Sequence, residues 1–172
     1  MKRTKITHIA LRLLFLLFCL IITSCNETKR YRIGVSQCSS DVWREQMNDE
    51  MRREATFSKN IDLDIRRGNE NHVLQAAQID SLVKEGVDLL IVSPSEEVAL
   101  TPAVEAAYRK GIPVILVDRR IRSNAYTAYV GADNRAIAHD AGMLIANRMK
   151  GKGTVAEFAG TLESTAGQQR HE

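Results

Sequence analysis

A carboxylate and a guanidinium stand side by side where a predicted strand ends. Residues 111–119 begin with a Gly-Ile-Pro turn, continue through four aliphatic residues and close on Asp118 and Arg119. A short aliphatic run bounded by Gly and Pro is typical of a buried strand in a parallel sheet. A carboxylate only accepts hydrogen bonds, and a guanidinium only donates them, in a fixed fork. Together they suit a ligand whose hydroxyl groups donate and accept at once, such as a sugar, although a surface ion pair would use the same residues.

Strand and helix patterns alternate along the chain from residue 31 onward, which predicts a doubly wound parallel α/β sheet. Ligands of such sheets bind beyond the carboxyl ends of the strands, where Asp118 and Arg119 are expected. Pro102 favours a start of the third helix near Thr101. The predicted strands are 31–36, 61–65, 87–92, 114–117, 126–130 and 153–158, and the predicted helices are 41–57, 71–84, 96–110 and 134–150.

The first 25 residues have the pattern of a bacterial export signal. Four basic residues precede an apolar run over residues 13–22, which is too short to span a bilayer but suits a secretory signal. Ile22-Thr23-Ser24-Cys25 resembles a lipobox, which implies a signal peptide over 1–24, lipid attachment at Cys25 and a membrane-anchored periplasmic protein. An uncleaved anchor and an ordinary signal peptide are the alternatives, and both also export the chain. Residues 25–30 are expected to form a tether.

The charge of the exported part is close to neutral. The chain holds 24 basic and 21 acidic residues, and four of the basic ones lie in the leader, so 20 remain and the net charge is −1. This balance gives no basic surface for nucleic acid. The four histidines and the cysteines show no metal-ligand spacing. Because no phosphate-binding glycine loop or catalytic constellation stands out either, we expect no metal, no cofactor and no enzymatic activity.

Several short motifs follow one another in a specific order. They are Val35-Ser36, Ile91-Val92-Ser93-Pro94, Gly111-Ile112-Pro113-Val114, Val117-Asp118-Arg119 and Gly131-Ala132-Asp133-Asn134. This order resembles the type I periplasmic sugar-binding family, typified by ribose-binding protein, and the ligand domain of lactose-repressor-like regulators. The resemblance extends over residues 31–172 and implies two α/β lobes that close on a monosaccharide. It implies a first lobe over 31–132 and the beginning of an incomplete second lobe over 133–172.

The resemblance assigns ligand-binding roles to residues from both lobes. Asp118 and Arg119 match the family's hydroxyl-binding pair. Arg170 matches an arginine that reaches the sugar from the second lobe. The implied site therefore combines a carboxylate and a guanidinium from one side with a guanidinium from the other.

The loop after the first strand carries the remaining candidates. Trp43 matches an aromatic position whose ring stacks on the apolar face of the sugar, and packing in the core is its alternative role. Ser40 matches a position where the family usually has asparagine. Gln37 and Asp41 are weaker candidates from the same loop. Because Val42 replaces the family's second aromatic, the sequence does not identify the sugar.

Three function classes follow from the resemblance. Residues 31–44 resemble the periplasmic input domain of hybrid two-component histidine kinases, so we expect a ligand-sensing domain of a sugar-responsive signalling protein, with kinase modules downstream. The alternative is a lipid-anchored binding component of a sugar ABC transporter, which would meet a permease. A lactose-repressor-like regulator is disfavoured because an export leader stands where its DNA-binding helices should be. A soluble enzyme with a Rossmann-like sheet is more distant still.

Overall fold

A five-stranded parallel sheet forms the centre of the protein, in the order β2-β1-β3-β4-β5. A computed structural model describes residues 29–172, so the predicted leader and Cys25 lie outside the described residues. The fold confirms the predicted doubly wound α/β class. The strands are β1 (Tyr31–Gln37), β2 (Ile61–Arg67), β3 (Leu89–Val92), β4 (Val114–Val117) and β5 (Ala128–Val130), and the helices are α2 (Val42–Thr56), α3 (His72–Lys84), α4 (Glu97–Arg109), α5 (Asn134–Arg148) and α6 (Thr165–His171).

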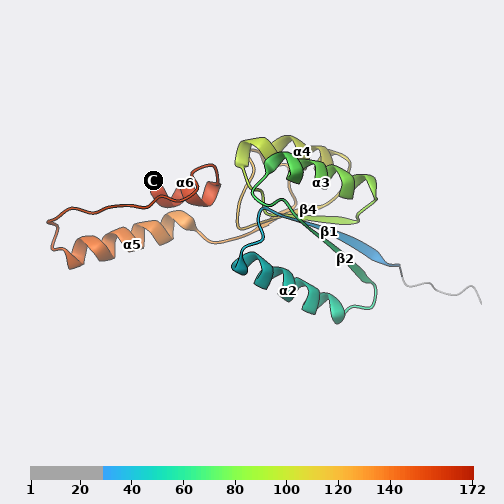
Figure 1. The fold of residues 1–172 in the computed structure, drawn as a ribbon, viewed down its shortest axis with the longest axis horizontal. Coiled ribbons are helices and arrows are strands. Elements are labelled where there is room, and N and C mark those ends of the chain that lie inside the picture. The colour runs from blue at the N-terminus through green and yellow to red at the C-terminus, as the bar shows by residue number, and fades with distance from the viewer. Residues whose placement is uncertain (1–28) are drawn as a thin grey trace, which may run out of the picture.

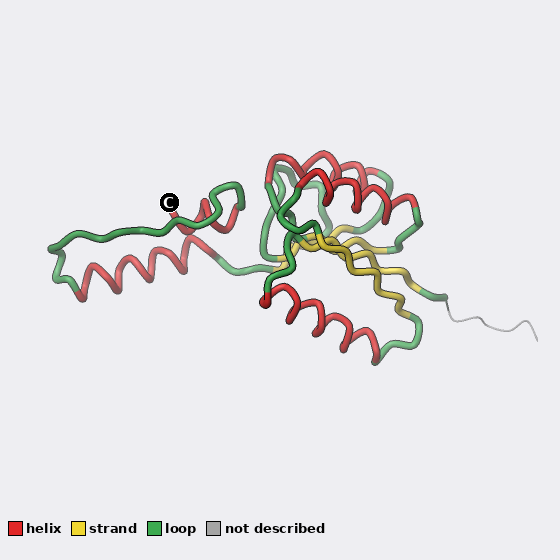
Figure 2. Tube along the Cα trace, in the orientation of Figure 1, coloured by secondary structure: helices red, strands yellow, loops and turns green. Residues whose placement is uncertain are grey.

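The helices cover the two faces of the sheet unequally. Helices α3 and α4 lie on one face, and α2 lies alone on the other (Figure 1). Figure 2 shows the strands as a single layer between these helices. The neighbours β1 and β3 are followed by helices on opposite faces, and a reversal of this kind opens a crevice at the carboxyl ends of the two strands. None of the helices within residues 29–172 combines the length and the apolar character that crossing a bilayer needs.

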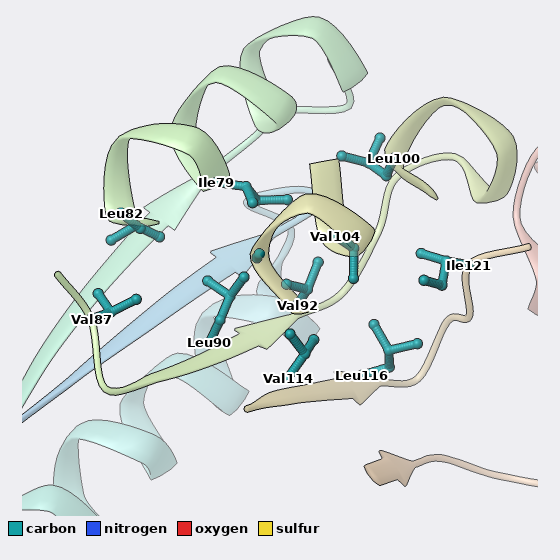
Figure 3. Close-up of a cluster of buried hydrophobic side chains, with 11 residues drawn as sticks. Ile79, Leu82, Val87, Leu90, Val92, Leu100, Val104, Val114, Leu116 and Ile121 are labelled. Carbon is teal, nitrogen blue, oxygen red and sulfur yellow. The ribbon is translucent and has the colours of Figure 1, made fainter. Parts of the chain in front are cut away.

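The hydrophobic core lies between the sheet and the helix pair α3 and α4 (Figure 3). Alternate residues of β3 and β4 point into it and are fully buried, whereas the residues between them are only half-buried on the α2 side. This alternation fixes which strand residues face the core, so the continuous apolar packing lies on the α3–α4 side of the sheet. The core residues are Ile79, Leu82, Val87, Leu90, Val92, Leu100, Val104, Ala107, Val114, Leu116 and Ile121.

Helix α4 begins earlier than the prediction from Pro102, which is wrong. Pro102 lies inside the helix, which starts at Glu97. Proline removes the hydrogen bond to the carbonyl four residues earlier and usually destabilises a helix interior. Leu100 in the preceding turn is nevertheless fully buried in the core, and the Thr101 hydroxyl donates to the Glu97 carbonyl at 2.7 Å. These contacts hold the first turn in helical form despite the proline.

The predicted strand over residues 153–158 does not form. A strand needs a neighbour with which to exchange backbone hydrogen bonds, and no described residue forms a ladder with this segment. Val155 and Phe158 are consequently exposed, at 58% and 97%. Residues 153–158 are apolar in part, as the sequence indicated, but they have no neighbouring strand among the described residues with which to pair.

Helices α5 and α6 pack on each other and extend away from the sheet (Figure 1). The chain reaches them through residues 131–133, directly after β5. Two hydrogen bonds connect the segment after β5 to the part of the chain that contains the sheet. The Arg120 N–H donates to the Thr165 hydroxyl at 2.9 Å, and the Glu97 N–H donates to the Glu163 carbonyl at 3.3 Å. Glu163 and Thr165, the first residue of α6, therefore lie at the same edge of the sheet as Asp118.

Candidate ligand-binding site

Asp118 follows β4 directly, at the carboxyl edge of the sheet. Its backbone has a φ of 64°, a left-handed conformation that residues other than glycine rarely adopt. Its N–H donates to the Val130 carbonyl at 2.8 Å, and its own carbonyl accepts from the Tyr129 hydroxyl at 3.0 Å. Strand β5 therefore holds the strained turn that presents the carboxylate. Strain of this kind is concentrated at functional sites.

Two guanidinium groups approach the same oxygen of Asp118. Arg44 Nη2 lies 2.5 Å from Asp118 Oδ2, and Arg119 Nε lies 3.8 Å from it. Arg119 also donates through Nη1 to the Ser95 carbonyl at 3.2 Å, which ties it to the loop after β3. The structure thus brings the predicted pair of Asp118 and Arg119 together and adds Arg44 to it. The predicted ligand-binding role of the pair stays a prediction.

Trp43 stands beside this cluster, in the first turn of α2. Its side chain is 57% exposed, so the indole does not pack in the core. The Arg44 guanidinium lies over the ring, 4.6 Å from its centre, which is a cation–π distance. More than half of the side chain is nevertheless open to solvent. An exposed ring that shares Arg44 with a carboxylate can stack on the apolar face of a ligand whose hydroxyl groups reach Asp118.

Asp41 caps the start of α2 and so places Trp43 and Arg44. One carboxylate oxygen accepts from the Arg44 N–H at 3.0 Å, and the other accepts from the Ser39 hydroxyl at 2.5 Å. The Ser39 hydrogen bond, with smaller contributions from the backbone N–H groups, lowers the pKa of Asp41 despite the opposing effect of burial. The cap is therefore charged at neutral pH, and its stabilisation is lost only as the pH falls through that lowered pKa.

The other loop candidates take different places. Gln37 is 1% exposed at the end of β1, and its Nε2 donates to Asn48 Oδ1 at 2.7 Å. Gln37 therefore stabilises the loop after β1 from the interior of the protein and does not lie on its surface. Ser40 is exposed on the loop and makes no side-chain hydrogen bond with the described residues. The structure does not test whether either residue binds ligand.

Arg170 lies apart from the other candidates. It belongs to α6, where its Nε donates to Asn134 Oδ1 at 2.8 Å and connects α6 to the first residue of α5. No described contact joins it to Asp118 or Trp43. The structure therefore does not bring Arg170 into the cluster, and its predicted role stays a prediction.

A tyrosine links the Asp118 turn to the crossing between the two parts of the chain. The Arg120 guanidinium lies 3.5 Å from the centre of the Tyr129 ring and donates to the Tyr126 hydroxyl at 2.8 Å. Burial raises the pKa of Tyr129, so its hydroxyl stays a donor to Asp118. A Cβ on Gly131 would overlap the Tyr129 hydroxyl and ring. A larger residue at the crossing would therefore have to displace this ring.

Sequence reasoning missed Arg44 and Tyr129. The signal for Arg44 was its spacing of four residues from Asn48, which places both on one face of α2, and both prove to be buried. Nothing in the sequence marked Tyr129, because its role depends on a contact with the turn after a different strand. Within residues 29–172, no group of three or more His, Cys, Asp and Glu side chains lies together in a way that could hold a metal ion.

Comparison with known proteins gives consistent matches. A family model described as a periplasmic binding protein domain matches residues 33–172. The fructose-binding periplasmic domain of the hybrid two-component system BT1754 is 50% identical, with a TM-score of 0.81 over 83% of this chain and 47% of that chain.

Two further relatives are more distant. The periplasmic binding protein component of the arabinose ABC transporter from Shewanella sp. ANA-3 is 27% identical, with a TM-score of 0.74 over 81% of this chain and 47% of that chain. A xylitol-binding protein of Mycolicibacterium smegmatis is 32% identical over 80% of this chain and 38% of its own length. The chain thus spans about half, or less, of the length of these relatives.

Gly131→Ala is expected to destabilise the protein by roughly 1–3 kcal/mol, because the new Cβ would overlap the Tyr129 ring. Gly142→Ala in α5 is the matched control. Nothing lies within 4 Å of a Cβ at that position, so alanine should stabilise the helix by about 0.5–1 kcal/mol. Urea denaturation of both variants measures the difference. Equal stability of the two would show that the Tyr129 ring is not held in place.

Proposed function

Because the chain belongs to the periplasmic binding protein family, we propose that it binds a monosaccharide in the periplasm as the ligand-sensing domain of a signalling protein. The observation that carries this proposal is the cluster at the carboxyl edge of the sheet. There Arg44 contacts both the exposed Trp43 ring and Asp118, whose turn and carboxylate are both fixed by neighbours. The 50% identity to the fructose-binding domain of a hybrid two-component system supports the sensing role.

The residues of the cluster have complementary roles toward a sugar. Asp118 accepts hydrogen bonds from hydroxyl groups, and Arg119 donates to hydroxyl oxygens. Trp43 covers the apolar face of the ring. Such a site replaces the hydration of the sugar with oriented polar groups and one apolar wall. The relatives named above are binding proteins, so we propose binding and no catalysis.

The division into lobes follows the shape of the chain. We assign the first lobe to residues 31–132 and the beginning of the second to 133–172, with the crossing at Gly131. Closure would carry Arg170, together with its partner Asn134 at the start of α5, toward the sugar. The ligand would then be held from both sides, and the closed state would be the signal. This division is supported by the way α5 and α6 extend from the sheet (Figure 1).

A binding component of a sugar ABC transporter is the second candidate. The similarity to the arabinose-transporter component, with a TM-score of 0.74, favours it. The same cluster would bind the sugar in either protein, so the site alone does not separate the two. What differs is the partner of the closed state, which is a kinase module in a sensor and a permease in a transporter.

Asp118→Asn is expected to weaken sugar binding about 10-fold or more, which corresponds to about 1.4 kcal/mol. The amide accepts at one atom only and leaves Arg44 and Arg119 without their counter-charge. Titration calorimetry of the full-length protein with D-fructose, D-ribose, L-arabinose and xylitol measures the loss. The emission of Trp43, which is the single tryptophan of the chain, should shift with the same midpoint.

The matched control is Asp62→Asn, since Asp62 is an exposed carboxylate at the opposite end of the strands. Its variant should bind like the wild type. Wild-type affinity in Asp118→Asn would contradict the assignment of the strand-end site.

The two candidate functions predict different phenotypes for a deletion of the gene. Loss of a sensor should abolish sugar-induced transcription while the initial uptake of radiolabelled sugar continues. Loss of a transporter component should abolish uptake itself. Re-expression of the Asp118→Asn variant should fail to restore whichever response is lost. Lost uptake with unchanged induction would overturn the sensing role.

We further propose that Cys25 anchors the protein to the membrane from the periplasmic side. The support is the Ile22-Thr23-Ser24-Cys25 motif, which lies outside the described residues. Intact-mass analysis of protein extracted from membranes should show loss of residues 1–24 and the added mass of lipid. Cys25→Ser should move the protein to the soluble fraction. An unlipidated wild-type protein in that fraction would contradict the anchor.

A further inference from the structure

Arg44 is a buried charge at the edge of the proposed site. Its side chain is 3% exposed, against 23% for Asp118. A charge removed from water to this extent is costly unless an opposite charge compensates it. The Asp118 carboxylate is that charge, with 2.5 Å between Arg44 Nη2 and Asp118 Oδ2. The position of one group therefore determines the position of the other.

We propose that Arg44 is a positioning residue that aims the Asp118 carboxylate at the ligand and thereby sets sugar selectivity. The inference rests on the proposed sugar-binding function and deepens it. Arg44 and Arg119 both approach Oδ2, whereas Oδ1 has no hydrogen-bond partner among the described residues. A carboxylate fixed through one oxygen presents the other in one direction. Oδ1 is then the atom that accepts from a sugar hydroxyl.

The same guanidinium also fixes the stacking surface. Arg44 lies over one face of the Trp43 ring, which leaves the opposite face for the sugar. One side chain therefore sets both the acceptor oxygen and the plane of the ring. The distance between Oδ1 and the Trp43 ring determines how far a sugar hydroxyl must lie from the apolar face that stacks on the ring. A sugar whose hydroxyl lies at another distance from that face, or on its other side, leaves Oδ1 unpaired and binds with lower affinity.

Contacts at both ends hold Arg44 in this orientation. Its backbone N–H is bound by the Asp41 cap, and its guanidinium is bound by Asp118. Below it, Gln37 and Asn48 form a buried polar pair on the side of α2 that faces the sheet. Nη1 of Arg44 is also buried and has no partner among the described residues. The Arg44 side chain is thus a buried group with fixed contacts and not a solvated surface arginine.

A double-mutant experiment on the full-length protein tests this role, with D-fructose, D-ribose, L-arabinose and xylitol as probes. Arg44→Gln is expected to lower the affinity for the preferred sugar about 10-fold and to reduce the ratio between the best and the poorest probe. The double variant Arg44→Gln/Asp118→Asn should bind as weakly as Asp118→Asn alone, because Arg44 acts through Asp118. Arg44→Lys keeps the charge without the fork, so affinity should recover more than selectivity.

Two controls separate positioning from a general loss of stability. Arg52→Gln removes an arginine from the exposed face of α2, where it pairs with Asp49, and should bind like the wild type. If Arg44→Gln does not fold, Arg44→Met/Asp118→Asn removes both charges together, a change that buried pairs often tolerate. Its affinity should equal that of Asp118→Asn. A purely structural role would lower the affinity for all four sugars by one common factor.

The outcomes are distinct. Wild-type affinity and selectivity in Arg44→Gln would overturn the assignment of Arg44 while leaving the sugar site in place. Losses that multiply in the double variant would show that Arg44 acts independently of Asp118, which also overturns it. Failure of the wild-type protein to bind any of the four probes would instead overturn the proposed function on which the inference rests.

Discussion

The conformation of Asp118 is the constraint on which the rest of the site depends. A residue other than glycine holds a left-handed backbone only where its surroundings impose it, and here β5 does so through Val130 and Tyr129. The turn directs the carboxylate toward the start of α2, where Arg44 meets it. The arrangement therefore needs β4, β5 and α2 together. Strand β5, although only three residues long, is thus the element that fixes the Asp118 turn.

The two faces of the sheet carry different side chains and contribute differently to the site. The aliphatic core under α3 and α4 fixes where β3 and β4 end, and therefore where Ser95 and Asp118 stand. The α2 side is only partly apolar and carries the buried polar pair of Gln37 and Asn48. The Gln37–Asn48 hydrogen bond fixes how the two amides face each other, while Gln37 Oε1 and Asn48 Nδ2 are buried without a partner among the described residues. The aliphatic face thus supports the site, and the polar face orients it.

The sequence predicted what depends on local pattern and missed what depends on distant contacts. Aliphatic runs identified the strands that gained a neighbour, and the place of Asp118 after such a run identified the candidate site. The run at 153–158 has the same pattern but no partner, and Pro102 was overridden by the burial of Leu100. The contact of Arg44 with Asp118 could not be predicted, because the two residues are 74 positions apart. The spacing of Arg44 and Asn48 indicates only that they share one face of α2.

The ion pair also bears on how a cleft of this kind can close. An uncharged sugar brings no counter-charge, so enclosing Asp118 with it alone would leave a carboxylate cut off from water, at a cost of several kcal/mol. Arg44 and Arg119 already stand at that carboxylate, so the closure proposed above would remove a neutralised group from solvent. On the same proposal, Arg170 would add a donor from residues 133–172, where the sugar oxygens provide acceptors. The charge compensation at Asp118 would then be what allows a neutral ligand to be enclosed.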